Sequence, residues 1–190
     1  MIIGLTGRAG AGKSTVAEYL NREYGFERCS FAAPLYESAA ALLGCTVAEL
    51  QKWKNDSRVR LEVNAYYPST MQPPLQMTIR QFLQRYGTEA HRDIFGEDFW
   101  SERPWINWTL DSRWVFDDVR FDNEAKAVRE HGGAIVRIDR SDARLYGEAA
   151  THPSEAGVPA DYVLSNDMEI VDLLEDVRGL MAYFYEGSKV

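Results

Sequence analysis

GRAGAGKS, residues Gly7 to Ser14, follows an apolar run from Met1 to Leu5 and precedes a helix-like run from Thr15 to Leu20. A glycine, four variable residues and then Gly-Lys-Ser is the spacing of a phosphate-binding loop (P-loop), whose glycines let backbone N–H groups surround phosphate oxygens. Such a loop requires a strand that leads into it and a helix whose N-terminus adds positive potential. Because both patterns are present, this stretch predicts a P-loop rather than a glycine-rich turn.

The P-loop pattern also assigns roles to its residues. Lys13 is expected to reach the β- and γ-phosphates of a nucleotide, and the hydroxyl of Ser14 is expected to be a ligand of Mg²⁺. The backbone of the loop is expected to bind the other phosphate oxygens. The predicted nucleotide-binding residues are therefore consecutive: Gly7, Arg8, Ala9, Gly10, Ala11, Gly12, Lys13, Ser14 and Thr15.

Length, composition and charge narrow the class of protein. A chain of 190 residues with 45% hydrophobic content can bury one sizeable core, so a single domain over residues 1–190 is expected. A formal net charge of -8 argues against general affinity for nucleic acid. Cys29 and Cys45 form neither a disulfide framework nor a metal-ligand spacing. No segment is long and apolar enough to span a membrane, and because the run from Met1 leads directly into the P-loop, no signal peptide is expected. A cytoplasmic location is expected.

Strand-like and helix-like segments alternate along the chain. This pattern predicts an α/β fold of the P-loop NTPase type, with three layers, a parallel sheet of about five strands and helices on both faces of the sheet. The expected strands are residues 1–5, 26–31, 113–118, 134–138 and 162–164. The expected helices are residues 14–22, 32–43, 46–53, 78–95 with an interruption at Gly87, 97–110, 122–131 and 168–185. Thr46 and Glu49 have the spacing of a capping box.

Two segments do not follow this alternation. Residues 55–77 show no clear period and are expected to form an excursion over the edge of the sheet where ligands bind. Residues 141–159 are polar and contain glycine, and they are expected to form a mobile lid.

Asp117 and Asp118 end the apolar run that begins at Trp114. In a parallel α/β sheet, ligands bind beyond the carboxyl ends of the strands, where the P-loop also lies. A carboxylate at the end of a strand beside the P-loop strand can hold Mg²⁺ or its waters. Because successive strand side chains point to opposite faces, the two aspartates cannot do the same job. The alternative for each is a solvated side chain at a strand end.

Five blocks of sequence support a closer comparison: GLTGRAGAGKSTVAEYL from Gly4, SFAAPL from Ser30, RQFLQRYGTEAHRDIFGEDFW from Arg80, DDVRFDNEA from Asp117, and HPSE from His152 with Asp161 and Asn166 after it. In these blocks and their order, residues 1 to about 166 resemble the bacteriophage-type deoxynucleoside monophosphate kinases. The LQxxGTE and DVRFxNEA patterns are the specific ones, because many folds share a P-loop. The chain departs from the family's pattern at Ser14, where Asp is frequent, at Ala33 and Tyr36, where an acidic residue and Lys are frequent, and at His91, where Gly is frequent.

The resemblance implies transfer of the γ-phosphoryl group of ATP to a deoxynucleoside 5′-monophosphate, with Mg²⁺. Nucleotides are then the expected partners, without nucleic acid or membrane, and assembly into a homodimer is left open. Residues 55–77 and the helices of residues 78–110 would bind the acceptor, and if a phage encodes the chain, the host cytoplasm is the expected location. The expected substrate-binding residues are Arg80, Gln84, Thr88, Arg92, Trp100 and Arg120. Arg120 would reach the phosphates, and Arg137, Arg140 or Arg144 would stabilise the transferring group. The expected catalytic residues are Lys13, Asp118, Arg120 and Arg140, and the expected metal ligands are Ser14 and Asp118.

Each assignment has an alternative. Arg80 and Arg92 could be exposed helix residues paired with Glu89 or Asp93. Arg137 could be a paired residue on a strand face, and Trp100 could belong to the core. At the level of function, dephospho-coenzyme A kinases share the strand and P-loop, but their Asp-Ala-Asp stretch is replaced by residues 28–31, RCSF. A nucleotide-binding regulator without catalysis is the third alternative.

Overall fold

The computed structural model describes residues 1–63, 75–141 and 158–187, which form two compact units. The sheet unit comprises Met1–Phe31 and Pro104–Val190, and the helical unit comprises Ala32–Arg103. The predicted lid lies outside the described residues, apart from Ser141 and residues 158–159. His152 and Glu155 of the HPSE block and Arg144 lie outside them as well.

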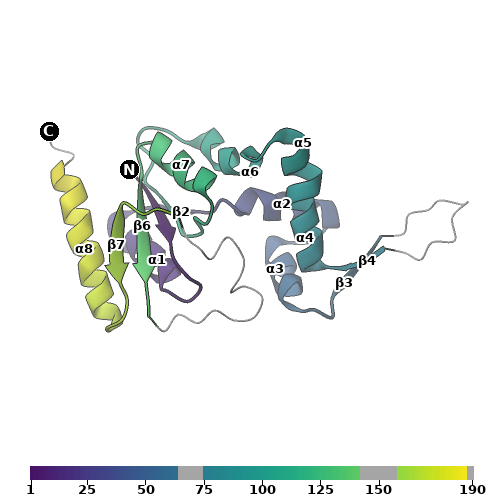
Figure 1. The fold of residues 1–190 in the computed structure, drawn as a ribbon, viewed down its shortest axis with the longest axis horizontal. Helices are drawn as coiled ribbons and strands as arrows, with labels where there is room; N and C mark the ends of the chain where they lie inside the picture. The colour runs from purple at the N-terminus through teal and green to yellow at the C-terminus, as the bar shows by residue number, and fades with distance from the viewer. Residues whose placement is uncertain (64–74, 142–157, 188–190) are drawn as a thin grey trace, which may run out of the picture. The chain divides into compact units, whose positions relative to one another are not determined.

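The sheet unit contains a five-stranded sheet in the order β2-β5-β1-β6-β7, in which every neighbouring pair is parallel (Figure 1). The strands are β1 (Ile2–Thr6), β2 (Glu27–Cys29), β5 (Trp114–Phe116), β6 (Ala134–Asp139) and β7 (Tyr162–Ser165). The predicted parallel sheet is confirmed. β2 is shorter than expected, because Ser30 and the Phe31 N–H bind a side-chain carboxylate instead of continuing the ladder.

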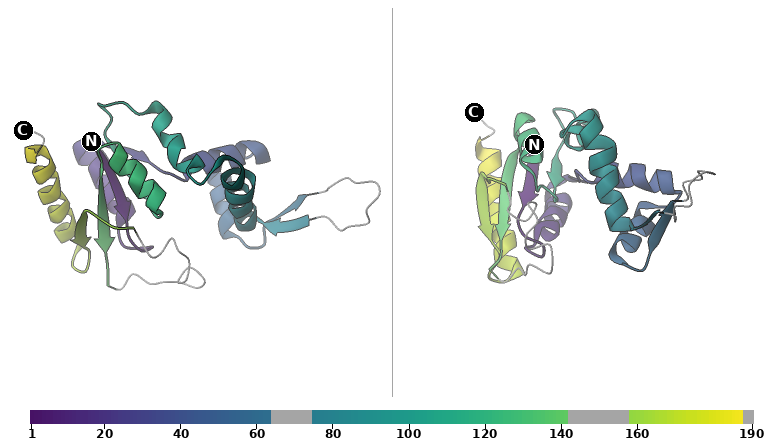
Figure 2. Two further views of the ribbon diagram at one scale, coloured as in Figure 1. Left: turned by 45° about the horizontal axis from the view of Figure 1, so that its top comes forward. Right: turned by 45° about the vertical axis from the view of Figure 1, so that its right-hand side comes forward.

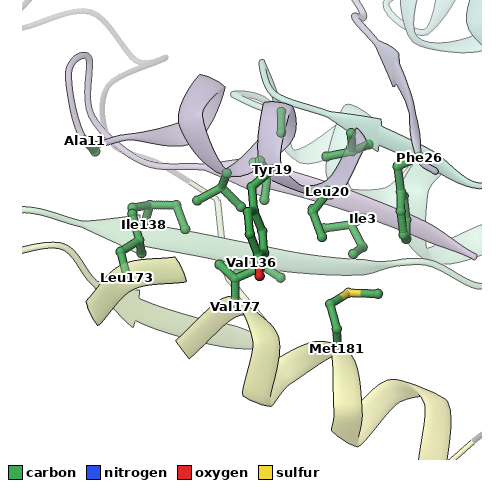
Figure 3. Close-up of a cluster of buried hydrophobic side chains, with 14 residues drawn as sticks. Ile3, Ala11, Tyr19, Leu20, Phe26, Val136, Ile138, Leu173, Val177 and Met181 are labelled. Atoms are coloured by element: carbon green, nitrogen blue, oxygen red, sulfur yellow. The ribbon is translucent and has the colours of Figure 1, made fainter. Parts of the chain in front are cut away.

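Alternation along the strands gives the sheet two apolar faces. On one face Ile3 and Leu5 of β1 pack with side chains of α1 (Lys13–Tyr24) and α8 (Ile170–Gly187). Figure 3 shows Ile3 in this cluster. On the other face Ile2 packs with Ala125 and Val128 of α7 (Asp122–Glu130). Figure 2 shows α8 running beside β7 at the edge of the sheet. Helices cover both faces, so the predicted three-layer arrangement is confirmed.

The helical unit packs three helices around a separate apolar cluster that includes Ala39, Leu50 and Leu83. These helices are α2 (Ala33–Leu43), α3 (Val47–Asn55) and α4 (Ile79–Gly87). The predicted capping box of α3 is present, since the Glu49 N–H donates to Thr46 Oγ1 at 3.2 Å and the Thr46 N–H donates to Glu49 Oε2 at 2.8 Å.

Residues 55–77, whose sequence shows no clear period, contain two short strands, and their expected place over the ligand-binding edge of the sheet stays a prediction. Strands β3 (Arg60–Val63) and β4 (Leu75–Thr78) form an antiparallel hairpin in which Leu61 pairs with Met77. Leu61 packs against the cluster of the helical unit, and Met77 is buried. The hairpin escaped the sequence pattern because its two short strands are separated by residues that carry no periodic signal.

The expected helix interruption at Gly87 is confirmed. Gly87 is the last residue of α4, and the chain continues through a π-helical turn, η1 (Thr88–Arg92), into α5 (Asp93–Phe95). The helix expected over residues 97–110 is reduced to α6 (Phe99–Glu102) and the 3₁₀ turn η2 (Arg103–Asn107), because Pro104 lacks the N–H that a helix interior requires. Among the described helices, none is long and apolar enough to cross a bilayer.

Candidate active site

The P-loop connects β1 to α1 with the backbone that its glycines predict. Gly7, Gly10 and Gly12 have φ values of 132°, 78° and 109°, a region that L side chains rarely adopt. Space is a second reason at Gly7, where a Cβ atom would lie 2.3 Å from the Ile138 carbonyl oxygen of β6. The glycines therefore bring the loop close to the carboxyl end of the neighbouring strand.

Lys13 begins α1, and its side chain folds back across the loop. Its Nζ donates hydrogen bonds to the carbonyl oxygens of Gly7 at 2.6 Å and Arg8 at 2.9 Å. Ser14 is exposed in the first turn of α1, and Thr15 is half-buried. The ammonium group and the helix N-terminus thus lie at the same loop, which provides the positive potential that phosphate binding needs.

Asp117 and Asp118 follow β5 and bind different partners. Asp117 Oδ2 accepts a hydrogen bond from Arg28 in an ion pair of 2.7 Å. Asp118 accepts from the Ser30 hydroxyl at 2.6 Å through Oδ2 and from the Phe31 N–H at 3.0 Å through Oδ1. The two carboxylates therefore have different partners, and the expected difference in their roles stays a prediction. The carboxylate of Asp118 also contributes, after burial and Glu27, to raising the pKa of the Cys29 thiol to about 12.

The carboxylate of Asp118 suits a magnesium site in which phosphate oxygens supply most of the ligands. Each carboxylate oxygen has two lone pairs, so an oxygen that accepts one protein donor can also accept a metal-bound water. Among the described residues, no three His, Cys, Asp or Glu side chains gather as a protein-only metal centre would require. Mg²⁺ needs no such group when phosphates supply most of its ligands.

Arg120 lies on the same edge of the sheet, because the Val119 N–H donates to the Leu5 carbonyl at 3.2 Å and holds the end of β5 beside β1. Its side chain is exposed. The next turn is held by Glu124, a buried carboxylate whose Oε2 accepts from the N–H groups of Arg120 at 2.7 Å and Phe121 at 3.1 Å. Glu124 therefore positions the backbone from which Arg120 projects.

On the other side of the P-loop, Arg140 follows the end of β6 and is exposed. Arg137 pairs with Asp139 of its own strand at 2.9 Å, which agrees with its alternative as a paired strand residue. Asp167 anchors the chain at Ser141, because its Oδ1 accepts from the Ser141 N–H at 2.6 Å and the Ser141 hydroxyl at 2.7 Å. These bonds, more than the nearby charge of Arg140, lower the pKa of Asp167.

The predicted substrate-binding residues other than Arg120 lie in the helical unit. Arg80, Gln84 and Thr88 are exposed and spaced by four residues, so they form one stripe beside the buried stripe of Ile79 and Leu83. Thr88 and Arg92 begin and end the π turn η1. Such turns are rare and often mark functional sites.

The contacts of Glu89 and Trp100 bear on the alternative assignments, in which the arginines are ion-paired helix residues and Trp100 belongs to the core. Glu89 forms an exposed ion pair with Arg85 at 3.0 Å, so this carboxylate has a partner on α4 other than Arg80. Trp100 is only 6% exposed, and its Nε1 donates to the Gly87 carbonyl at 3.0 Å, where α4 gives way to the π turn. This geometry favours a structural role for Trp100, and its contact with substrate stays a prediction.

Sequence reasoning gave no individual role to Ser30, Glu124, Asn166 or Asp167. Asn166 Nδ2 donates to the Ala11 carbonyl of the P-loop at 2.8 Å. The sequence signal that could have indicated them is position, since Ser30, Asn166 and Asp167 come directly after strands whose carboxyl ends lie at the P-loop edge of the sheet, and Glu124 lies in the helix after β5.

Comparison with known proteins agrees with this geometry. A candidate deoxynucleotide monophosphate kinase of Acanthamoeba polyphaga mimivirus is 29% identical over 189 residues, covering 93% of this chain and 94% of the relative. The deoxynucleoside-5′-monophosphate kinase of Escherichia phage T5 is 26% identical over 241 residues, covering 97% of this chain and 94% of the relative. A candidate kinase from Chloroflexus aurantiacus has the same fold, with a TM-score of 0.52 at 14% identity over 98% of this chain and 96% of that one.

The family comparison is the most specific. Residues 54–177 match the deoxynucleotide monophosphate kinase family, and this range is more than half of the chain. The matched range includes the predicted substrate-binding residues and also Asp118, and it ends within α8. Together with the P-loop and the parallel sheet, the match shows that this chain is a kinase and belongs to the deoxynucleotide monophosphate kinase family.

Proposed function

We propose that this enzyme transfers the γ-phosphoryl group of ATP to a deoxynucleoside 5′-monophosphate and releases ADP and the deoxynucleoside diphosphate. The observation that carries the proposal is the P-loop geometry, with Lys13 held across the glycine loop at the start of α1. Family membership supports the class of acceptor, because both curated relatives are named as kinases of deoxynucleotide monophosphates.

The chemistry requires positioning and charge stabilisation rather than a general base. An oxygen of the acceptor phosphate is already anionic, and it forms a bond to the γ-phosphorus while the bond from that phosphorus to the bridging oxygen of ADP breaks. Lys13 would offset charge on the β- and γ-phosphates. Arg120 and Arg140, which follow β5 and β6 on either side of the P-loop strand, would offset charge that develops on the transferring group.

Ser14 and Asp118 would hold Mg²⁺ with the nucleotide, Ser14 through its hydroxyl and Asp118 through metal-bound water. The ion supplies neutralisation of phosphate charge. In the helical unit, Arg80 and Arg92 would bind the acceptor phosphate, and Gln84 and Thr88 would donate or accept hydrogen bonds along the same stripe.

A coupled assay of ADP release tests the proposal with a panel of acceptors. Deoxynucleoside monophosphates should give ADP release that depends on the acceptor. Ribonucleoside monophosphates test the sugar preference, and dephospho-coenzyme A tests the alternative kinase class. Release that is fastest with dephospho-coenzyme A, or a rate that no acceptor increases, would contradict the proposed acceptor.

A further inference from the structure

Asn166 is the first residue after β7, at the edge of the sheet that carries the P-loop. Its backbone N–H donates to the Asp139 carbonyl of β6 at 2.7 Å. Its side-chain Nδ2 donates to the Ala11 carbonyl at 2.8 Å, across 155 positions of sequence. Asn166 therefore ties the last turn of the P-loop to the end of β6.

The bonded carbonyl belongs to the peptide unit that also carries the Gly12 N–H. No described peptide is cis, and in a trans peptide the C=O and N–H bonds point in opposite directions. A bond from Asn166 on one side of this unit therefore directs the Gly12 N–H to the other side. Gly12 is the N-cap of α1, where backbone N–H groups bind phosphate in a P-loop.

The space beside Gly12 supports the same conclusion. A Cβ atom at Gly12 would lie 2.7 Å from Asn166 Nδ2 and 3.5 Å from Leu173 of α8, so the amide fills the side of the loop that faces α8. Ala11 is fully buried against this side. The peptide unit is thus held from the side of the protein core.

We propose that Asn166 is a positioning residue of the kinase reaction, whose amide holds the Ala11–Gly12 peptide so that the Gly12 N–H faces the phosphates of the donor nucleotide. This role rests on the proposed function. Asn166 acts through the loop backbone and need not touch the nucleotide. Aspartate at this position would present an oxygen to the Ala11 carbonyl and could not donate, so the orientation would be lost without a change in side-chain size.

Asn166→Asp tests the proposal, with Asn21→Asp as the matched control. Asn21 Nδ2 also donates to a backbone carbonyl of the sheet unit, that of Phe26 at 2.6 Å, but it lies in the last turns of α1. The probes are AMP-PNP, a non-hydrolysable ATP analogue, and inorganic tripolyphosphate, which has no base or sugar. Binding is measured by calorimetry and folding by thermal melting without nucleotide.

Asn166→Asp should weaken the binding of both probes by about tenfold, the effect of losing one oriented charge-assisted donor. Asn21→Asp should lower the melting temperature and leave both affinities unchanged. If Asn166→Asp does not fold, Asn166→Ala serves instead, because it removes the donor without adding charge, and about a threefold loss is then expected.

Two results would overturn the positioning role. One is unchanged affinity for both probes. The other is weaker binding of AMP-PNP alone, because this would mean that Asn166 contacts the base or sugar directly. Failure of the wild-type protein to bind AMP-PNP would instead refute the proposed function. The experiment therefore distinguishes failure of the positioning role of Asn166 from failure of the proposed function.

Discussion

Replacing Asp118 by asparagine separates the charge of this carboxylate from its hydrogen bonds. Asp118 accepts from the Ser30 hydroxyl at 2.6 Å and from the Phe31 N–H at 3.0 Å. An asparagine amide has the same shape, its oxygen can still accept from Phe31, and the Ser30 hydroxyl can turn to accept from its NH₂ group. The free energy of unfolding should therefore change by less than about 1 kcal/mol.

Turnover should respond far more strongly. If Asp118 holds metal-bound water during transfer, loss of its charge should lower kcat on the order of 100-fold and weaken the response to Mg²⁺. Asp117→Asn is the matched control. Its ion pair with Arg28, whose side chain is 45% exposed, contributes less than about 1 kcal/mol to stability, and turnover should hardly change.

Asp118→Ala is the third variant, because it removes the bonds accepted from Ser30 and Phe31 and leaves the N–H of Phe31 without this acceptor in a residue that is only 2% exposed. It should cost about 1–3 kcal/mol of stability. The melting temperature should then fall by roughly 2–4 °C per kcal/mol for a chain of this length. Thermal melts by circular dichroism and initial rates across a Mg²⁺ titration measure both effects. A larger kinetic loss in Asp117→Asn than in Asp118→Asn would refute the assignment, and equal destabilisation by asparagine and alanine would refute the hydrogen-bond reasoning.

Lys13→Ala should abolish phosphoryl transfer and leave the melting temperature nearly unchanged. Lys126→Ala, at an exposed ion pair of α7, is the control and should change neither the transfer rate nor the melting temperature. Near-normal transfer by Lys13→Ala would rule out the P-loop role of Lys13. Arg92→Ala should cost roughly 2–4 kcal/mol in kcat/KM for the acceptor, and Arg92→Lys should raise the acceptor KM with little change for ATP, because lysine lacks the planar pair of donors. Arg85→Ala breaks the exposed ion pair with Glu89 and serves as the control in the steady-state kinetic measurements. Wild-type acceptor kinetics in Arg92→Ala would show that Arg92 does not bind the acceptor. Burial is the main reason that the pKa of Cys29 is raised to about 12, so this side chain should remain almost entirely a thiol at pH 8. It should therefore react with iodoacetamide far more slowly in the folded than in the unfolded protein. Equal reaction rates, measured by mass spectrometry, would contradict the burial of Cys29.

The sequence by itself determined the features that depend on neighbours along the chain. The P-loop glycines require backbone angles that few other residues adopt, so their spacing predicted the loop at Gly7, Gly10 and Gly12. The capping box at Thr46 is another such feature, because its partner Glu49 is only three residues away in the sequence. The apolar runs predicted five strands and their parallel arrangement, because strands that alternate with helices pair in parallel.

Only the tertiary structure decided how distant residues meet. Nothing near Asn166 in the sequence indicates that its amide binds Ala11, 155 residues away, and Ser30 and Asp118 are 88 residues apart. The burial of Trp100 against Gly87 depends likewise on how the helical unit packs. Local patterns encode backbone preference and which side of an element is apolar, whereas the partner of a polar side chain depends on which strand ends the completed sheet brings together.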